Sequence, residues 1–254
     1  MLAAERRDLL LARLRADGKL VARDLARELG LSDDSVRRDL RELAAAGLCQ
    51  RVYGGALPPS PALASYPDRS AVRPDSKARV AARAAALITP GATVILDGGT
   101  TTLAVVRALP PDLPCTVITH SPTIAAALLG HHAADVLILG GRLFRHSAVA
   151  CGAIAAAAAQ AVSADLFLLG VTGVHPAAGL TTGDPEEAAM KRILASRAAD
   201  TYVLASAEKI GAASRYQVVP LTEVAGVITD APGADPVVAA LTDQGVAIVQ
   251  AHQN

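Results

Sequence analysis

The segment ARELGLSDDSVRRDLRELAAAGLCQRVYGGAL, residues 26–57, contains the pattern that best indicates the architecture of the N-terminal part of the chain. Ser32 is a suitable N-cap residue, and Asp33 and Asp34 follow it, where the helix dipole favours negative charge. A helix is therefore expected to begin here. Its core-facing positions recur at helical spacing: Val36, Leu40 and Leu43.

Two further helices are expected before this one. The first stops near Asp17 and Gly18, and the second ends at Gly30 after an apolar stripe with a spacing of four residues. The stripe consists of Val21, Leu25 and Leu29. A short turn between two helices, with basic groups on the second of them, is typical of helix-turn-helix geometry.

After Gly47, the alternating segment that ends at Gly54 and Gly55 predicts a short β-hairpin wing. Such a wing would carry Arg51 and Tyr53 toward a phosphate backbone or the minor groove. The alternative is a solvated three-helix bundle whose arginines only keep it soluble. The candidate DNA-binding residues are Lys19, Ser32, Ser35, Arg37, Arg38, Arg41, Arg51 and Tyr53.

The composition of the 254 residues excludes several classes of protein. The 24 basic and 24 acidic side chains balance, so any affinity for nucleic acid must be local. Aromatic residues are only 2% of the chain, which argues against folds that bind nucleic acid by stacking on bases. Neither a secretory leader nor a membrane-spanning stretch is expected, and we predict a cytoplasmic protein.

The three cysteines, Cys49, Cys115 and Cys151, are odd in number and lack metal-ligand spacing. They are interpreted as small apolar residues in a reducing compartment. No metal site and no cofactor are expected.

A proline-rich stretch separates residues 1–57, expected to form the DNA-binding domain, from residues 75–254, expected to form a larger domain. Proline cannot donate a backbone hydrogen bond, so the linker at 58–74 is predicted to be extended and semi-rigid. Its prolines are Pro58, Pro59, Pro61, Pro67 and Pro74.

The larger domain alternates strand-like apolar runs with alanine-rich helical patterns. The candidate strands cover residues 92–97, 115–120, 135–141, 165–171, 201–206, 226–230 and 246–249. Their continuous apolar character predicts a largely parallel sheet with helices on both faces, hence an α/β fold. Sheets of this kind bind ligands at the carboxyl ends of their strands.

The first of these strands leads into DGGTTT, residues 97–102, which predicts a phosphate site. Gly98 and Gly99 permit tight turns, and Thr100, Thr101 and Thr102 offer hydroxyl and N–H groups at the start of a helix. The alternative is an ordinary turn with an N-cap. The Gly-Lys-Thr/Ser ending of a P-loop is absent.

Other strand ends complete the candidate effector-binding set. Glu186, Glu187 and Lys191 share or neighbour one helical face, and Lys209 follows the strand at 201–206. A surface ion pair and a solvated lysine are the respective alternatives. The whole set is Asp97, Gly98, Gly99, Thr100, Thr101, Thr102, Thr119, His120, Gly141, Gly170, Thr172, Glu187, Lys191 and Lys209.

These segments in this order resemble DeoR-type transcriptional repressors, from the Ser32 helix with Arg37 and Arg38 to the EKIG segment that holds Lys209. The resemblance covers about residues 3 to 250. It implies a winged helix-turn-helix domain followed by a sensor domain with the fold of ribose-phosphate isomerase, glucosamine-phosphate deaminase and CoA-transferase relatives. It also implies a repressor of carbohydrate-metabolism genes that a phosphorylated sugar or related metabolite releases from operator DNA.

The chain also departs from the pattern of this family. Gly98 stands where the family usually has Ser, His120 where it has Asn, and Thr172 where it has Asp. Ser206 to Lys209 replaces an Asp-Ser-Ser-Lys run. The lost groups are those that the resemblance assigns to sugar hydroxyls, so the effector is left unidentified.

A rival interpretation is a phosphosugar isomerase or deaminase fused to a DNA-binding module. Such chemistry requires a carboxylate base and an acid, for which Glu186 or Glu187 with Lys191 or Lys209 could serve. We expect no enzyme activity. Because one helix-turn-helix unit reads only a short half-site, the chain is expected to form a dimer or a tetramer.

Overall fold

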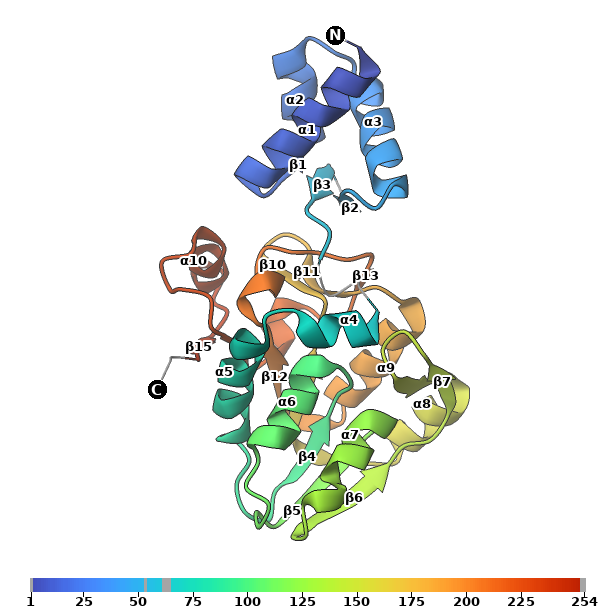
Figure 1. Cartoon of the computed structure of the whole chain (residues 1–254), viewed down its shortest axis with the longest axis vertical. Helices are drawn as coiled ribbons and strands as arrows, with labels where there is room; N and C mark the ends of the chain where they lie inside the picture. The colour runs from blue at the N-terminus through green and yellow to red at the C-terminus, as the bar shows by residue number, and fades with distance from the viewer. Residues whose placement is uncertain (1, 53, 61–64, 252–254) are drawn as a thin grey trace.

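The computed structural model describes residues 2–52, 54–60 and 65–251. The helices and strands of the first 57 residues lie at one end of the long axis, and the larger α/β unit fills the rest (Figure 1). None of the helices in these ranges is long and apolar enough to cross a membrane.

The three expected N-terminal helices are present as α1 (Ala3–Asp17), α2 (Ala22–Leu29) and α3 (Asp33–Ala45). Ser32 caps α3 as predicted, since its hydroxyl accepts a hydrogen bond from the N–H of Ser35 over 3.2 Å. The buried residues Leu10, Val36 and Leu40 belong to the core that the three helices share.

The wing is also confirmed, with one strand more than expected. Strands β2 (Gln50–Val52) and β3 (Gly55–Leu57) pair antiparallel, and β3 pairs on its other side with β1 (Leu20–Val21). A Cβ atom at Gly55 would lie 1.8 Å from the carbonyl oxygen of Leu20. Glycine is therefore required where β1 approaches β3.

The prediction of an extended linker is wrong for residues 66–71, which form helix α4 (Tyr66–Ala71). The hydroxyl of Ser65 caps this helix, and Pro67 lies in its first turn, where a missing N–H costs nothing. The number of prolines favoured an extended chain, but a proline in the first turn of a helix, such as Pro67, does not prevent the helix from forming.

All seven predicted strands are found in one parallel sheet. Its order is β15-β14-β12-β9-β4-β5-β6. The strands are β4 (Thr93–Leu96), β5 (Cys115–Thr119), β6 (Ala134–Ile138), β9 (Ala164–Gly170), β12 (Ala198–Leu204), β14 (Gly226–Thr229) and β15 (Ile248–Gln250).

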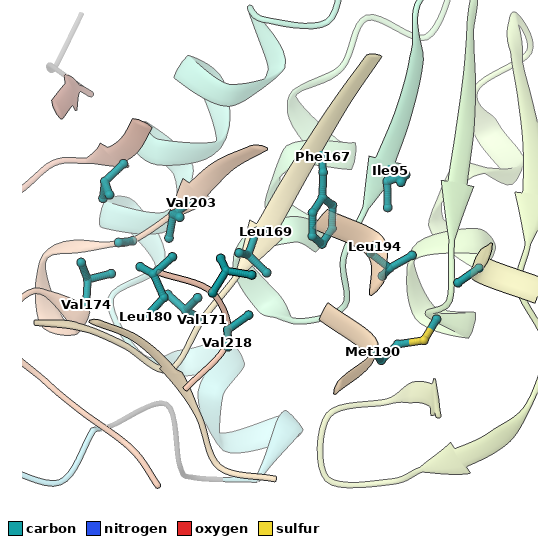
Figure 2. Packing of buried hydrophobic residues seen from close by; sticks show 14 of the residues in the cluster. Ile95, Phe167, Leu169, Val171, Val174, Leu180, Met190, Leu194, Val203 and Val218 are labelled. Atoms are coloured by element: carbon teal, nitrogen blue, oxygen red, sulfur yellow. The ribbon is translucent and has the colours of Figure 1, made fainter. Parts of the chain in front are cut away.

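Helices cover both faces of this sheet. One apolar cluster contains residues of α5 (Pro74–Ala85), α6 (Thr100–Ala108) and α7 (Pro122–Ala127). The other contains residues of α8 (Ala153–Gln160), α9 (Pro185–Ala195) and α10 (Pro236–Asp243), with Phe167 among its fully buried side chains (Figure 2). The sheet is thus the middle layer of three.

Several short elements, which the sequence did not predict, complete the domain. They are the hairpin β7 (Arg142–Phe144) and β8 (Val149–Cys151), the sheet of β10 (Gly173–His175), β11 (Gly179–Thr182) and β13 (Tyr216–Gln217), and the 3-10 turns η2 (Leu128–Gly130), η3 (Ala207–Lys209) and η4 (Leu221–Glu223). The sheet β10-β11-β13 lies on the side of the large unit that faces the N-terminal domain (Figure 1).

Candidate functional site

A pocket opens where β4, β9 and β12 end. Ten of the predicted effector-binding residues line it: Gly98, Gly99, Thr100, Thr101, Thr102, Gly170, Thr172, Glu187, Lys191 and Lys209. The structure therefore gathers residues more than a hundred positions apart in the sequence around one cavity.

The first turn of α6 forms one wall of this pocket. Gly99 precedes the helix with a φ of 114°, and among the described residues no side chain caps the helix start. The first N–H groups of a helix have no acceptor within the helix, and the dipole adds positive potential there. This wall is suited to an anion such as a phosphate group.

Lys209 approaches the same turn from η3. Its Nζ donates hydrogen bonds to Thr101 Oγ1 over 3.2 Å and to the carbonyl oxygen of Leu204 over 3.4 Å. Burial lowers the pKa of Lys209 to about 8, although the neighbouring Glu208 acts in the opposite direction. An anion in the pocket would stabilise the charged form of this lysine.

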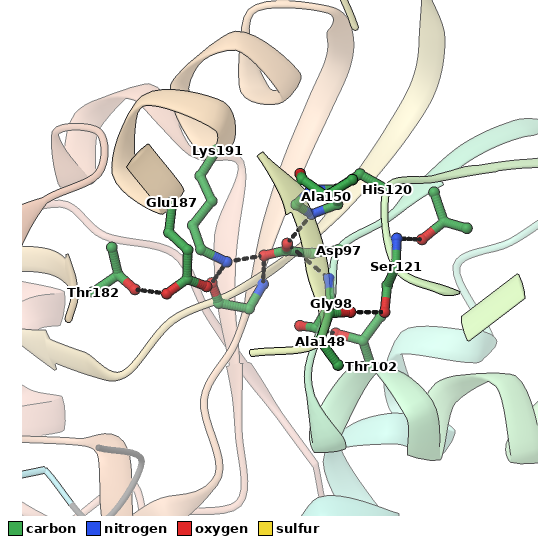
Figure 3. A network of polar contacts seen from close by, with 12 residues as sticks. Asp97, Gly98, Thr102, His120, Ser121, Ala148, Ala150, Thr182, Glu187 and Lys191 are labelled. Atoms are coloured by element: carbon green, nitrogen blue, oxygen red, sulfur yellow. Dashed lines mark hydrogen bonds and ion pairs between the residues drawn. The ribbon is translucent and has the colours of Figure 1, made fainter. Parts of the chain in front are cut away.

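Lys191 lines the pocket and donates a hydrogen bond from Nζ to Asp97, which is not part of the pocket lining (Figure 3). Asp97 is fully buried and accepts further hydrogen bonds from the N–H groups of Gly98 and Gly170, each over 2.8 Å. Burial alone would raise the pKa of Asp97, but Lys191 and His120 outweigh it and hold this pKa well below its usual range. Asp97 is therefore an ionised anchor for Lys191.

The structure places four predicted effector-binding residues outside the pocket lining: Asp97, Thr119, His120 and Gly141. His120 holds the β8 hairpin instead, with Nε2 2.9 Å from Asp97 Oδ1 and Nδ1 2.9 Å from the carbonyl oxygen of Ala150. Thr119 accepts a hydrogen bond from the N–H of Ser121, and Gly141 packs against Ala155. Their positions at strand ends predicted the correct edge of the sheet. The sequence does not show which of these side chains point into the pocket.

Seven lining residues were missed: Arg69, Val72, Lys77, Ser147, Val171, Thr182 and Glu208. Arg69 and Lys77 come from α4 and α5, which precede the first strand, so a search of strand ends did not reach them. The sequence did contain an indication for Lys77, because its spacing places it on the same buried face of α5 as Val80 and Ala81. A lysine on an apolar helix face is unusual unless its charge is paired.

Two buried polar atoms of pocket-lining residues have no hydrogen-bond partner within the described ranges. They are Arg69 Nε, a donor, and Glu208 Oε2, an acceptor. The other oxygen of Glu208 accepts from the hydroxyl of Ser206 over 2.6 Å. Buried polar groups without partners cost free energy.

Most of the candidate DNA-binding side chains lie on the outside of the N-terminal domain. Exposed members are Lys19, Ser32, Arg37, Arg38, Arg41 and Arg51, whereas Ser35 is half-buried and Tyr53 lies outside the described residues. Arg37 pairs with Asp33 over 3.0 Å, an exposed contact that a phosphate could replace.

Asp39, between these arginines and Leu40, has a different role that sequence reasoning missed. Its side chain is buried and accepts hydrogen bonds from the guanidinium of Arg6 on α1. This bidentate pair fixes α3 against α1, and thereby the direction in which Arg37 and Arg38 point.

Comparisons with known proteins cover both parts of the chain. Residues 6–62 match the family model of the DeoR-like helix-turn-helix domain, and residues 72–231 match that of the DeoR C-terminal sensor domain. The HTH-type transcriptional regulator GlpR of Haloferax volcanii is 34% identical over 91% of each chain.

Further similar proteins include the putative aga operon transcriptional repressor of Escherichia coli O157:H7, 32% identical over 89% of this chain and 86% of that protein. The glycerol-3-phosphate regulon repressor of Escherichia coli K12 is 27% identical over 97% and 98% of the two chains. Among solved structures, ribose 5-phosphate isomerase A of Methanocaldococcus jannaschii is 18% identical over 51% of each chain, with a TM-score of 0.38.

Proposed function

The chain belongs to the DeoR family of transcriptional regulators, and we propose that its pocket binds a phosphorylated sugar or polyol whose binding releases the protein from operator DNA. The observation that carries this proposal is the wall formed by the uncapped start of α6 together with Lys209. This combination offers backbone N–H groups and a cation to one anionic group.

The balance of charge supports an anionic effector. Four cationic side chains line the pocket, Arg69, Lys77, Lys191 and Lys209, against the carboxylates of Glu187, Glu208 and the underlying Asp97. One positive charge is thus in excess. The unpartnered oxygen of Glu208 adds an acceptor for a hydroxyl group, which a sugar or polyol supplies.

One relative is named for the glycerol-3-phosphate regulon, so that compound belongs in the first set of candidates. The first experiment is a thermal-shift screen of the full chain with glycerol 3-phosphate, fructose 6-phosphate and ribose 5-phosphate, each beside its unphosphorylated form. A ligand that binds only the native state raises the melting temperature. Stabilisation by the phosphorylated members alone supports the proposal, and equal effects of both forms would contradict it.

We further propose that the protein acts as a regulator without turnover. Thr172 has no carboxylate, its hydroxyl donates to the carbonyl oxygen of Thr181 over 2.9 Å, and the Glu187 carboxylate accepts from the hydroxyl of Thr182 over 3.3 Å. Isomerisation or deamination of any phosphosugar of the panel by the purified chain would overturn this part of the proposal.

Operator DNA, the effector and further copies of the chain are the proposed partners. A single helix-turn-helix unit reads a short half-site, so useful specificity calls for at least two copies related by symmetry. We propose that the protein is cytoplasmic, because a regulator that binds operator DNA acts where that DNA lies. Light scattering of the full chain at about micromolar concentration should show a dimer or a tetramer, and a monomer both with and without DNA would contradict it.

A further inference from the structure

Arg69 lies in the wall of the pocket although it belongs to the segment that joins the two domains. The two family models match residues 6–62 and 72–231, so neither covers this arginine. It projects from α4, next to pocket residues contributed by α5 and by the β7–β8 hairpin.

Neighbouring groups position the guanidinium of Arg69, but they do not accept hydrogen bonds from all of its N–H groups. Nη2 donates to the carbonyl oxygen of His146 over 2.9 Å, and the guanidinium carbon lies 5.6 Å from the centre of the Tyr66 ring. Lys77 donates to the backbone carbonyl oxygen of Arg69, which fixes α4 against α5. The Nε–H group is buried and has no acceptor in the described part of the chain.

Arg69 also carries its charge in a partly dehydrated place. Burial lowers the pKa of Arg69, and Glu187 only partly offsets this effect. A buried donor without a partner costs free energy, and the cost is larger if the donor is charged. An anionic oxygen at Nε would remove this cost and pair the charge.

We propose that Arg69 is a direct ligand of an anionic oxygen of the effector, and that this contact links pocket occupancy to the segment that carries the DNA-binding domain. The inference rests on the proposed function, since it assigns a further ligand to the same pocket. It adds to the site a residue that lies outside the part of the chain matched by the sensor-domain model.

The linker contacts the pocket wall at a second place, before residues 61–64. Pro59 forms a β-bridge with Ala213, and the hydroxyl of Ser60 donates to the carbonyl oxygen of Thr172, which lines the pocket. Ser60 follows closely on β3 of the wing. The pocket is thus in contact with the linker at two places, through Thr172 with Ser60 and through Arg69 itself.

Calorimetry of the full chain with glycerol 3-phosphate and with inorganic phosphate tests the direct contact. Four proteins are compared: wild type, Arg69→Gln, Arg73→Gln and Lys209→Met. Arg73 is exposed on the same segment and does not line the pocket, so its variant controls for the loss of one positive charge. We expect Arg69→Gln to weaken binding of the probes at least about tenfold and Arg73→Gln to leave it unchanged.

The outcomes separate this inference from the proposed function. If Lys209→Met weakens binding but Arg69→Gln equals wild type, Arg69 is not a ligand and the inference is overturned while the proposed function stands. If wild type binds neither probe nor any phosphorylated member of the panel, both the inference about Arg69 and the proposed function are overturned.

A direct measurement on wild type covers the case in which Arg69→Gln does not fold. The Nε–Hε resonances of arginine are recorded by NMR, and that of Arg69 is assigned by its absence in Arg69→Lys. Phosphate addition should shift this resonance downfield, because the proton gains an anionic acceptor. An unchanged resonance at saturating probe would overturn the inference.

The coupling is measured by DNA affinity of the folded variants at saturating glycerol 3-phosphate. A duplex selected from a randomised pool by the wild-type protein serves as the operator. Saturating ligand should release wild type and Arg73→Gln but leave Arg69→Gln at least partly bound. Full release of Arg69→Gln at saturation would show that the linker contact does not transmit the signal.

Discussion

Lys209 donates a hydrogen bond from Nζ to Thr101 Oγ1, so a buried lysine on η3 is joined to the first turn of α6. The two residues are 108 positions apart, and only the parallel order of β4, β9 and β12 brings them together. In the free protein this hydroxyl and the neighbouring carbonyl of Leu204 are the acceptors that Lys209 has within the described ranges. A phosphate would be a stronger one.

Lys209→Met should stabilise the protein at neutral pH while weakening effector binding. The pKa of Lys209 is lowered from 10.5 to about 8, so the folded state holds this charge at a cost below about pH 8. Between the two values the unfolded chain binds more protons, and the stability of wild type gains from this group as pH rises. Melting temperatures at several pH values check this.

The matched control for that comparison is Lys19→Met, since Lys19 is exposed. The variant Lys209→Met should melt above wild type at about pH 7, and the difference should close near pH 10.5. A lower melting temperature for Lys209→Met at neutral pH would show that its hydrogen bonds outweigh the cost of burying the charge.

Asp97→Asn should destabilise the fold strongly. The change leaves Lys191 buried without its charged partner, and breaking a buried ion pair on one side costs about 3 to 5 kcal/mol. Urea denaturation of the variant beside Asp200→Asn, an exposed carboxylate on β12, measures the difference. Equal midpoints for the two variants would remove Asp97 from the role of anchor.

Gly98→Ala should be destabilising for a reason that can be tested by a second change. A Cβ atom at this position would lie 2.0 Å from Val149 Cγ1 on β8, and overpacking of this kind costs about 1 to 3 kcal/mol. In the background of Val149→Ala the cost of Gly98→Ala should fall, which a double-mutant cycle detects. Additive effects would mean that the two residues do not compete for this space.

Arg37→Ala combined with Arg38→Ala should abolish detectable specific DNA binding. Both side chains are exposed on α3, and a specific contact is worth about 1 to 3 kcal/mol. Gel shifts with the selected duplex check this, with Arg83→Ala as the control because Arg83 is exposed on α5 of the other domain. Unchanged affinity in a folded double variant would contradict the assignment of α3 as the recognition helix.

The sequence predicted the main elements because their signals are local. Ser32 with its acidic neighbours marks the start of α3, and runs such as the one from residue 165 to 171 mark buried strands. The helix α4 and the small sheet with β10 were missed because their stability depends on packing and on single capping residues such as Ser65.

The pocket was predicted only in part, for a geometric reason. The sequence indicates that Thr101 and Lys209 lie at the same edge of the sheet, but it does not give the direction of each side chain. The sequence therefore indicated that His120 lines the pocket as Thr101 does. In the structure His120 does not line it, and its ring contacts Asp97 instead. No sequence pattern indicated that Arg69 lines the pocket, because it lies there only as a result of the way the linker folds.

The role of the pocket as the effector site is tested by fluorescence anisotropy of a labelled selected duplex, during titration with the phosphorylated compound that stabilises the protein most. Wild type should release the duplex, whereas Thr101→Asp, which places a fixed negative charge at the start of α6, should no longer respond. The unphosphorylated form of the compound should have no effect on either protein. Release of the duplex by Thr101→Asp at the same concentration as wild type would contradict the assignment of this pocket as the effector site.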